Sequence, residues 1–282
     1  MILNEKPQLN IAILDLYNGA VNQGMRGLKE IINNFGIKKG LQIKLSIFDV
    51  RQKSELPDLN FDLYLSTGGP GSPIESEGEK WDTLYFQWIR DIEAYNHSPE
   101  NIQKRPVFFI CHSFQLACRY FKIGKLTKRK SNSFGVFPVH MLEDGAHEPV
   151  FNGLKNPFYA MDSRDYQVIE PDYQRIHELG SKILAIEKKR PHVPLQRAMM
   201  AVRFTDQFIG TQFHPEADPE GMLKWLNNPE KKESIIENHG FEKWKSMIEQ
   251  LHDPDKIRMT HAHVLPNFLQ LALNNCLTAT EV

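Results

Sequence analysis

The sequence of 282 residues predicts an α/β protein, because short apolar runs alternate with segments of helical periodicity in its first half. Asn10–Leu16 is an apolar run that ends in a turn, and Met25–Ile32 after it repeats apolar residues at helical spacing. Pro106–Ile110 is a continuous apolar run, too short for a helix and typical of a strand buried on both faces. Helical periodicity resumes directly after Cys111, so we expect this cysteine at a strand-to-helix corner.

The other elements of the first half follow the same alternation. The spacing predicts strands over Leu41–Val50 and Phe61–Thr67, and the second of these ends in the glycine-rich loop Gly68–Pro73. A helix is expected over Asp82–Ala94, with Asp82 as its N-terminal cap.

The second half changes to hairpins and then to helices. A tight turn at Thr205-Asp206 is expected between the last two strands. The predicted strands are Gly135–His140, Phe158–Met161, Ile183–Glu187, Met199–Phe204 and Phe208–Phe213. The predicted helices are Pro219–Leu226, Glu233–Leu251 and about Asp255–Asn275, the last broken or kinked at Pro266.

Composition narrows the function classes. With 34 Lys and Arg against 35 Asp and Glu, the net charge is -1, which argues against nucleic acid as a partner. No apolar stretch approaches the roughly 20 residues of a membrane span, and the N-terminus has no apolar signal core, so a cytoplasmic protein without a membrane partner is expected. Cys111, Cys118 and Cys276 are expected to be free thiols, because their number is odd and their spacing irregular.

Three motifs follow predicted strands, at the edge where open α/β sheets bind ligands. They are Gly68–Pro73, Cys111 and His214-Pro215-Glu216. A cysteine at the first turn of a helix gains thiolate character from the aligned backbone dipoles, which makes Cys111 a candidate nucleophile. His214 and Glu216 are two apart in an extended segment, so both side chains point the same way and the carboxylate can orient the imidazole.

An acyl-transfer site also needs donors for a developing oxyanion, and paired backbone N–H groups supply them in many enzymes. Glycine lets a backbone approach this closely, so the N–H groups of Gly69 and His112 are the candidates. The His112 side chain is given no catalytic role. Lys128-Arg129-Lys130 is expected to be a solvated turn, with a partner surface as the alternative.

The ordered motifs Thr67–Pro73, Pro106 to Gln115, Phe134-Gly135 with Pro138-Val139, and GTQFHPE at Gly210–Glu216 resemble those of class I, triad-type glutamine amidotransferases. Among these, the chain is similar to stand-alone proteins like the amidotransferase domain of GMP synthase. The resemblance covers about Asn10 to Leu226.

The resemblance implies a flavodoxin-like three-layer sandwich with a mostly parallel central sheet over residues 1–226, and residues 227–282 then form a helical extension packed on the same domain. It also implies a Cys111–His214–Glu216 triad that hydrolyses the glutamine side-chain amide through a γ-glutamyl thioester. Gly69 and His112 would form the oxyanion hole, and Gly71 and Gln115 would help to hold the substrate. No cofactor and no metal ion are implied.

Two positions depart from the family pattern, which usually has glycine two residues before and two after the cysteine. Here they are Phe109 and Ser113. Phe109 would narrow the glutamine pocket, shift the corner or mark a protein that has lost the reaction. Where the family often has a histidine after a serine, this chain has Ser163-Arg164-Asp165, and the Arg164 guanidinium is a candidate for binding a carboxylate.

Three alternatives to a glutamine amidotransferase stay open. One is a hydrolase of γ-glutamyl peptides or amines, another a catalytically silent regulatory or binding subunit, and the third an acyltransferase. The substrate is L-glutamine or a γ-glutamyl compound, and a separate synthase subunit or a second copy of the chain is open as a partner. His261 and His263 are two apart in a predicted helix and face different ways, so they are not expected to bind a metal.

Overall fold

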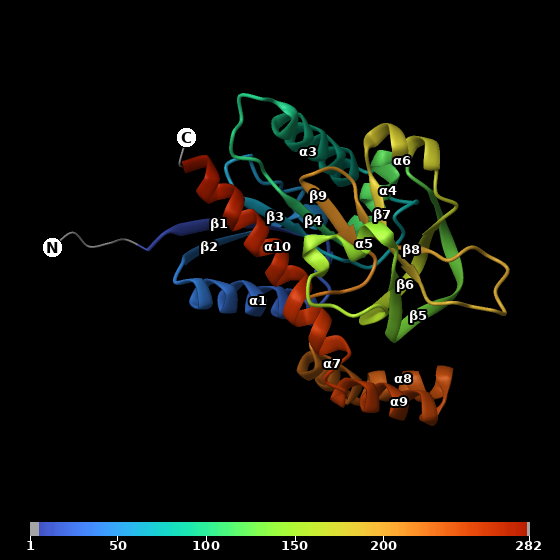
Figure 1. Ribbon diagram of the computed structural model, residues 1–282. Coiled ribbons are helices and arrows are strands. Elements are labelled where there is room, and N and C mark those ends of the chain that lie inside the picture. Colours follow the sequence, from blue (N-terminus) through green and yellow to red (C-terminus); the bar gives the residue numbers. More distant parts are fainter. Residues whose placement is uncertain (1–5, 281–282) are drawn as a thin grey trace.

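A nine-stranded sheet forms the centre of the computed structural model, which describes residues 6–280 (Figure 1). The strands lie in the order β2-β1-β3-β4-β9-β8-β7-β5-β6. Their bounds are β1 (Gln8–Asp15), β2 (Gln42–Asp49), β3 (Leu63–Ser66), β4 (Val107–Ile110), β5 (Lys125–Met141), β6 (Phe158–Ile169), β7 (Lys182–Glu187), β8 (Met199–Arg203) and β9 (Phe208–Thr211).

Neighbouring strands are parallel from β2 to β9, and their buried apolar residues fit a sheet covered on both faces. In the register of β4 with β9, Phe109 lies opposite Gly210. From β9 to β6 all neighbours are antiparallel, beginning with the hairpin at Thr205, whose carbonyl accepts from the Phe208 N–H. The predicted α/β fold with its central sheet is confirmed, and the sheet carries an antiparallel extension.

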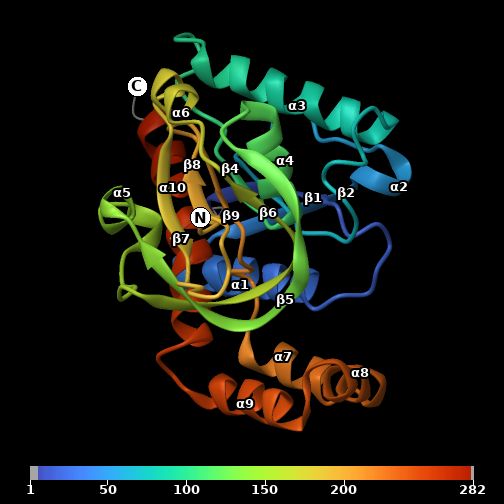
Figure 2. The ribbon, with the colours of Figure 1, turned by 90° about the vertical axis from the view of Figure 1, so that its right-hand side faces the viewer.

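Helices cover both faces of the sheet (Figures 1 and 2). One core cluster joins the sheet to α1 and α10, for example through Leu28 and Phe268, and a second joins it to α3 and α4 through Trp88 and Phe114. The helix bounds are α1 (Gly24–Lys39), α2 (Val50–Lys53), α3 (Lys80–His97), α4 (His112–Phe121), α5 (Glu143–Ala146), α6 (Tyr173–Leu179), α7 (Pro219–Leu226), α8 (Pro229–His239), α9 (Phe241–His252) and α10 (Ile257–Thr280), with a 3-10 turn η1 (Pro149–Phe151).

Helices α7, α8 and α9 form a separate layer below the sheet in Figure 2. A third apolar cluster attaches this layer to β5 and β6, and it includes Val136, Met161, Met222 and Met247. The division expected at residue 226 remains a prediction. Among residues 6–280, no helix combines the length and the apolar character that crossing a bilayer requires.

Three local expectations need correction. The helix expected over Glu233–Leu251 is two helices separated at Gly240, whose φ of 86° ends the first. Of the break or kink expected at Pro266, the break does not occur, because helix α10 continues through this residue. Asp82 does not cap α3; it lies in the first turn, where its buried carboxylate pairs with Arg119.

The turn expected at Lys128-Arg129-Lys130 is also wrong, because these residues lie within β5. The side chain of Arg129 is only 9% exposed and pairs with Glu187, whereas Lys128 and Lys130 on either side of it are exposed. The usual alternation of apolar and polar residues does not mark this strand, because its inward side chains are themselves polar.

Candidate active site

Cys111 occupies the sharp corner between β4 and α4, as the sequence predicts. Its backbone has φ 49° and ψ -97°, a conformation that costs a non-glycine residue about 1–3 kcal/mol and persists only where its surroundings hold it. The Cys111 N–H donates to the Thr211 carbonyl over 2.7 Å, and the buried Ser113 hydroxyl bonds the Ile110 N–H and the Ser66 carbonyl. These bonds fix the corner that presents the sulfur.

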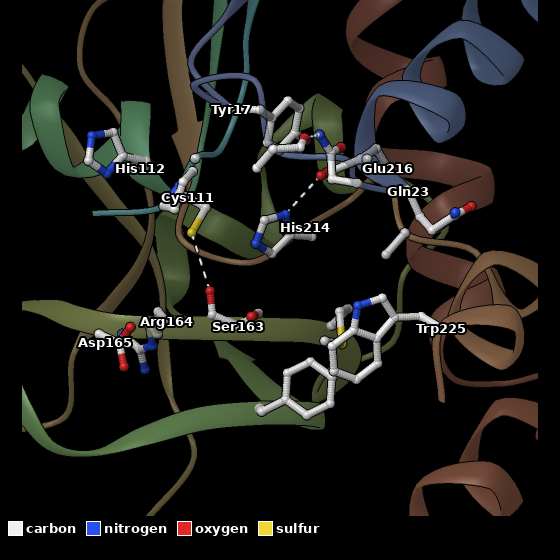
Figure 3. Close-up of a pocket in the computed structure, with 18 of the residues that line it drawn as sticks. Tyr17, Gln23, Cys111, His112, Ser163, Arg164, Asp165, His214, Glu216 and Trp225 are labelled. Carbon is white, nitrogen blue, oxygen red and sulfur yellow. Dashed lines mark hydrogen bonds and ion pairs between the residues drawn. The ribbon is translucent and has the colours of Figure 1, made fainter. Parts of the chain in front are cut away.

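His214 and Glu216 follow β9 and lie beside Cys111 (Figure 3). The His214 Nδ1 is 2.8 Å from Glu216 Oε1, and the His214 N–H donates to the Met161 carbonyl over 2.9 Å. A Cβ at Gly68 would lie 3.0 Å from His214 Cε1 and 3.4 Å from Cys111 Cβ, so Gly68 leaves the space in which these two side chains meet. With Nδ1 bound to the carboxylate, Nε2 faces the sulfur.

The charge state of His214 follows from these neighbours. Burial lowers the pKa of the imidazole, but the negative charges of Glu216 and Cys111 and the hydrogen bonds to them outweigh burial and raise it well above its usual value. Glu216 itself is 1% exposed. These neighbours therefore favour the protonated form of His214.

The two oxyanion candidates flank the nucleophile. His112 is the first residue of α4, so its N–H has no partner within the helix. Its side chain lies beside Trp81, and burial, with Arg51 and Arg119 nearby, lowers its pKa to about 3 and keeps it neutral. Gly69 packs on the Leu16 carbonyl so closely that a Cβ would collide with it. Both amides lie beside the pocket that contains Cys111.

Gln115 lies in the pocket wall, but its side-chain amide is engaged by the protein. Its Nε2 donates to Gln212 Oε1 over 3.0 Å and to the Tyr166 carbonyl over 3.2 Å. Gln212 in turn places its Nε2 3.6 Å from Cys111 Sγ. Gln212, which the sequence analysis did not single out, is therefore the glutamine that contacts the nucleophile. Gly71 lines the same pocket with φ 94°.

The pocket has a volume of about 370 Å³, within the usual range for small-molecule sites. Tyr17 enters it from the end of β1, and helix α7 supplies Met222 and Trp225. Sequence reasoning missed these residues. Tyr17 follows a strand at the same edge as the three motifs, a signal that could have found it, whereas nothing in the sequence places α7 against this pocket.

The Tyr17 phenol belongs to the same buried cluster as Glu216. Burial and the charges of Glu216 and Cys111 raise its pKa well above the usual value, so it stays protonated. Helix α1 approaches through two glycines: a Cβ at Gly24 would collide with the Tyr17 hydroxyl, and one at Gly27 with the Glu216 carbonyl. This close approach fixes the position of the Glu216 carboxylate.

Phe109 does not narrow the pocket. Its side chain is fully buried on the opposite side of the corner and packs edge-on against Phe204 and Phe208, with ring centroids 6.0 and 5.7 Å away. Gly210 makes room for it, because a Cβ there would lie 3.0 Å from the Phe109 Cβ. The departure from glycine thus changes the core behind the nucleophile.

Arg164 is already paired with carboxylates of the protein. Its side chain has no exposed surface, and it bonds Asp162 at 3.0 Å and Glu187 at 2.9 Å. The backbone beside it does reach the nucleophile, since the Ser163 carbonyl lies 3.6 Å from Cys111 Sγ. The guanidinium therefore holds the strand that faces Cys111. Among residues 6–280 there is no cluster of His, Cys, Asp and Glu able to hold a metal ion.

Together, the sheet, the strained cysteine corner and the imidazole–carboxylate pair define an α/β protein that gathers a cysteine, a histidine and a glutamate at one edge of its sheet. The chain belongs to the class I glutamine amidotransferases, because the model of that family, "Glutamine amidotransferase class-I", matches residues 25–229. No curated protein matches the chain.

Solved structures share this fold at low sequence identity. A glutamine amidotransferase from Thermotoga maritima is 14% identical with a TM-score of 0.65, covering 94% of this chain and 97% of its own. A glutamine amidotransferase from Methylobacillus flagellatus is 15% identical with a TM-score of 0.57 and covers 95% of each chain. The glutaminase domain of Trypanosoma brucei CTPS, with bound acivicin, is 16% identical with a TM-score of 0.53, covering 74% and 86%. At these identities the likeness concerns the fold alone.

Proposed function

We propose that this protein hydrolyses the side-chain amide of L-glutamine through a γ-glutamyl thioester on Cys111. The observation that carries the proposal is the strained Cys111 corner facing an imidazole whose Nδ1 is bound to Glu216 at 2.8 Å. A nucleophile, a base and a buried group that orients the base form the arrangement that acyl transfer requires.

In the first half of the reaction, the Cys111 sulfur attacks the amide carbon while His214 Nε2 holds the proton that the sulfur has given up. The oxygen of the tetrahedral intermediate becomes an anion, which the N–H groups of Gly69 and His112 stabilise. His214 then gives its proton to the leaving nitrogen, the carbon–nitrogen bond breaks and ammonia departs. Glu216 holds the imidazole in place throughout.

In the second half, His214 takes a proton from water, and the hydroxide attacks the thioester carbon. The carbon–sulfur bond breaks, glutamate leaves, and the free sulfur beside a protonated His214 is restored. Gly71 and Gln115 help to shape the substrate pocket, and Gln212 contacts the sulfur. No cofactor enters either half.

The test uses acivicin, an electrophilic glutamine analogue that one structural relative carries. The purified chain is incubated with acivicin, its intact mass is measured and the adduct is mapped. We expect one adduct, on Cys111, that L-glutamine prevents, and no adduct on Cys111→Ala. Loss of the nucleophile should also lower any turnover by at least about 10⁴-fold, with an unchanged melting temperature.

Cys118 provides the internal control, because it is fully buried and burial raises its pKa well above the usual value. An adduct on Cys118 or Cys276, or labelling of Cys111 that glutamine does not slow, would contradict the proposal and favour a silent binding subunit. This assay does not require a synthase partner, whereas release of ammonia can depend on one.

A second candidate, hydrolysis of γ-glutamyl amines or peptides, is favoured by the apolar wall of the pocket. Phe134 and Trp225 pack with ring centroids 4.7 Å apart, next to Met161 and Met222. Such a wall suits a leaving group that is larger and less polar than ammonia. A panel of γ-glutamyl compounds, compared with glutamine by kcat/KM, separates the two: a preference of tenfold or more for an apolar amine would favour the second.

The proposal also concerns the partners of this protein. A glutamine amidotransferase delivers ammonia to a synthase, and we propose that the synthase is a separate subunit. A second copy of the chain, in a homodimer, is the other proposed partner. Residues 227–282 would serve as a helical extension of the catalytic domain, and the cytoplasm as its compartment. An acyltransferase would instead pass the γ-glutamyl group to an acceptor other than water.

A further inference from the structure

A second cavity of about 420 Å³ lies next to the catalytic pocket, and the two share Asn132 and Phe134 in their walls. Strand β5 forms one side of this cavity, the segment after β7 a second and helix α9 a third. None of its remaining residues is used by the proposed reaction. We refer to it as the basic cavity.

The basic cavity is lined by cations without anions. Among the described residues that line it there is no Asp or Glu. The whole chain carries 34 basic and 35 acidic residues, so this imbalance is local. The charged lining residues are Arg129, Lys188, Lys189, Arg190 and Lys243, with His192 beside them.

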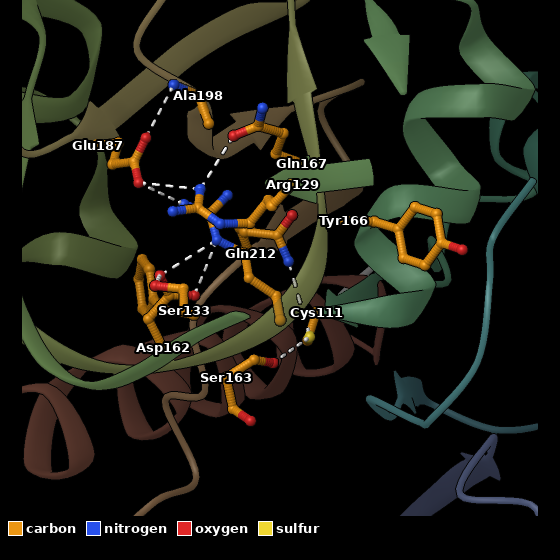
Figure 4. Close-up of polar contacts among 12 residues, drawn as sticks. Cys111, Arg129, Ser133, Asp162, Ser163, Tyr166, Gln167, Glu187, Ala198 and Gln212 are labelled. Carbon is orange, nitrogen blue, oxygen red and sulfur yellow. Dashed lines mark hydrogen bonds and ion pairs between the residues drawn. The ribbon is translucent and has the colours of Figure 1, made fainter. Parts of the chain in front are cut away.

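The nearest carboxylates are already shared among several guanidinium groups (Figure 4). One oxygen of Glu187 accepts from Arg129 at 3.1 Å and from Arg164 at 2.9 Å. Its other oxygen accepts from Arg190 at 2.9 Å. Asp162 pairs with Arg164. Three guanidinium groups therefore surround two carboxylates, and these carboxylates offset the positive charge around Lys188 only in part.

The lysines of the basic cavity account for its excess of positive charge. Among residues 6–280, no carboxylate lies within 4.0 Å of the ammonium of Lys188, Lys189 or Lys243. The ammonium groups of Lys188 and Lys243 lie 3.7 and 4.9 Å from the centre of the same ring, that of Phe137. Gly135 lies beside this group: a Cβ there would lie 3.3 Å from Phe137 Cζ and 3.6 Å from Lys243 Nζ.

Two cations at one ring repel each other, and the environment reflects this repulsion. Burial lowers the pKa of Lys188, and the charge of Lys243 lowers it further. Burial also lowers the pKa of Lys243. A bound anion would remove both penalties, because it would neutralise the ammonium groups where they stand.

We propose that the basic cavity binds a small molecule that carries phosphate. Three lysines without carboxylate partners call for an anion with more than one negative charge, which a phosphate ester or a diphosphate supplies and a single carboxylate does not. Phe137 and Met247 give the cavity an apolar side as well, which suits the organic part of such a ligand.

The site lies outside the proposed thioester chemistry, so it can be tested without any turnover. Isothermal titration calorimetry with Cys111→Ala protein would compare inorganic phosphate, pyrophosphate and ADP with citrate and a hexaglutamate peptide. We expect saturable binding of the phosphate compounds. ADP should bind most tightly if the apolar side of the cavity contributes to affinity, and pyrophosphate should bind most tightly if only charge contributes. Binding should weaken with added salt.

Lys188→Gln and Lys243→Gln should each weaken phosphate binding about tenfold, because each removes one charged contact. The matched control is Lys245→Gln on the same helix α9, whose exposed side chain lies 4.0 Å from Glu249 and outside the cavity. An unchanged melting temperature shows that the variants are folded.

Several results would overturn the proposal. They are no binding of any phosphate compound, equal binding by Lys188→Gln, Lys243→Gln and wild type, or binding of citrate or the peptide alone. Acivicin labelling of Cys111 is measured in parallel on active protein, so a failure of the basic cavity and a failure of the glutaminase proposal give different patterns.

Discussion

The two halves of the sheet bury charge in opposite ways. In the parallel half, the central strands β3, β4 and β9 consist of buried residues without charge, and the site at their edge contains the His214–Glu216 pair. In the antiparallel half, from β8 to β6, Glu187 and Asp162 lie buried among three guanidinium groups.

The difference separates two uses of a buried carboxylate. In the proposed reaction Glu216 orients a single side chain, so its loss should change a rate and leave the fold intact. Glu187 connects β5, β6 and the segment after β7, so its loss should change stability. Exchanging each carboxylate for its isosteric amide tests the contrast directly.

The largest effect is expected from Glu216→Gln. Without the carboxylate, His214 is no longer held in its orientation, and its protonated form is no longer stabilised by a negative neighbour. The rate of Cys111 labelling by acivicin should therefore fall by about 10²–10⁴-fold. This rate is measured by quenching the labelling reaction at a series of times and determining the intact mass of the protein. A loss of less than about fivefold would remove Glu216 from the triad.

The same variant changes the pH dependence of stability. The pKa of His214 is raised in the folded protein, so its contribution is full below about pH 6.5 and is lost as pH rises through the raised pKa. In the Glu216→Gln protein, burial dominates and the pKa of His214 falls. The decrease in the free energy of unfolding with rising pH should therefore disappear. Urea unfolding at a series of pH values from 6 to 9 measures both slopes.

Glu187→Gln should act on stability instead. Removing this charge leaves Arg129, Arg164 and Arg190 buried with Asp162 as their remaining carboxylate, at a cost of about 3–5 kcal/mol in the free energy of unfolding. Urea unfolding measures it. The control is Glu249→Gln in an exposed pair with Lys245, expected to change stability by less than about 1 kcal/mol.

Labelling of Cys111 in the folded Glu187→Gln protein should stay within about tenfold of wild type, because Glu187 does not contact the triad. A stable Glu187→Gln protein with a hundredfold slower labelling rate would reverse the contrast between the two halves. It would mean that the Glu187 network sets the position of the Ser163 carbonyl on the sulfur.

The smallest effect is expected from Tyr17→Phe. The ring keeps its packing, while the protonated hydroxyl beside Glu216 is lost, which should lower the labelling rate about fivefold, or about 1 kcal/mol. Tyr173→Phe serves as the control, because Tyr173 is 71% exposed on α6. Equal rates for the two variants would show that the Tyr17 hydroxyl has no part in holding Glu216.

The catalytic edge could be predicted because its residues are local in sequence. Cys111 follows an apolar run and opens a helix, and His214 and Glu216 are two apart in a single motif, so strand ends alone bring them to one edge. The glycine loop is equally local. Their roles remain a proposal, but their convergence follows from the order of the strands.

The antiparallel half could not be predicted in the same way. The strand from Lys125 is hidden by Lys128-Arg129-Lys130, because its inward charges are neutralised by carboxylates distant in the sequence. The consequence of Phe109 also depended on a distant residue, Gly210, which makes room for the ring on the neighbouring strand.

The sequence by itself therefore determined the α/β class, the nucleophile corner and the histidine–glutamate pair, since periodicity and strand ends are properties of short segments. Only the tertiary structure decided which glutamine contacts the sulfur, where the Arg164 guanidinium goes and that cations gather beside the catalytic pocket. Each of these depends on the distance between side chains from separate strands and helices. The energy of a buried charge is set by the neighbours that neutralise it, and those neighbours are distant in the sequence.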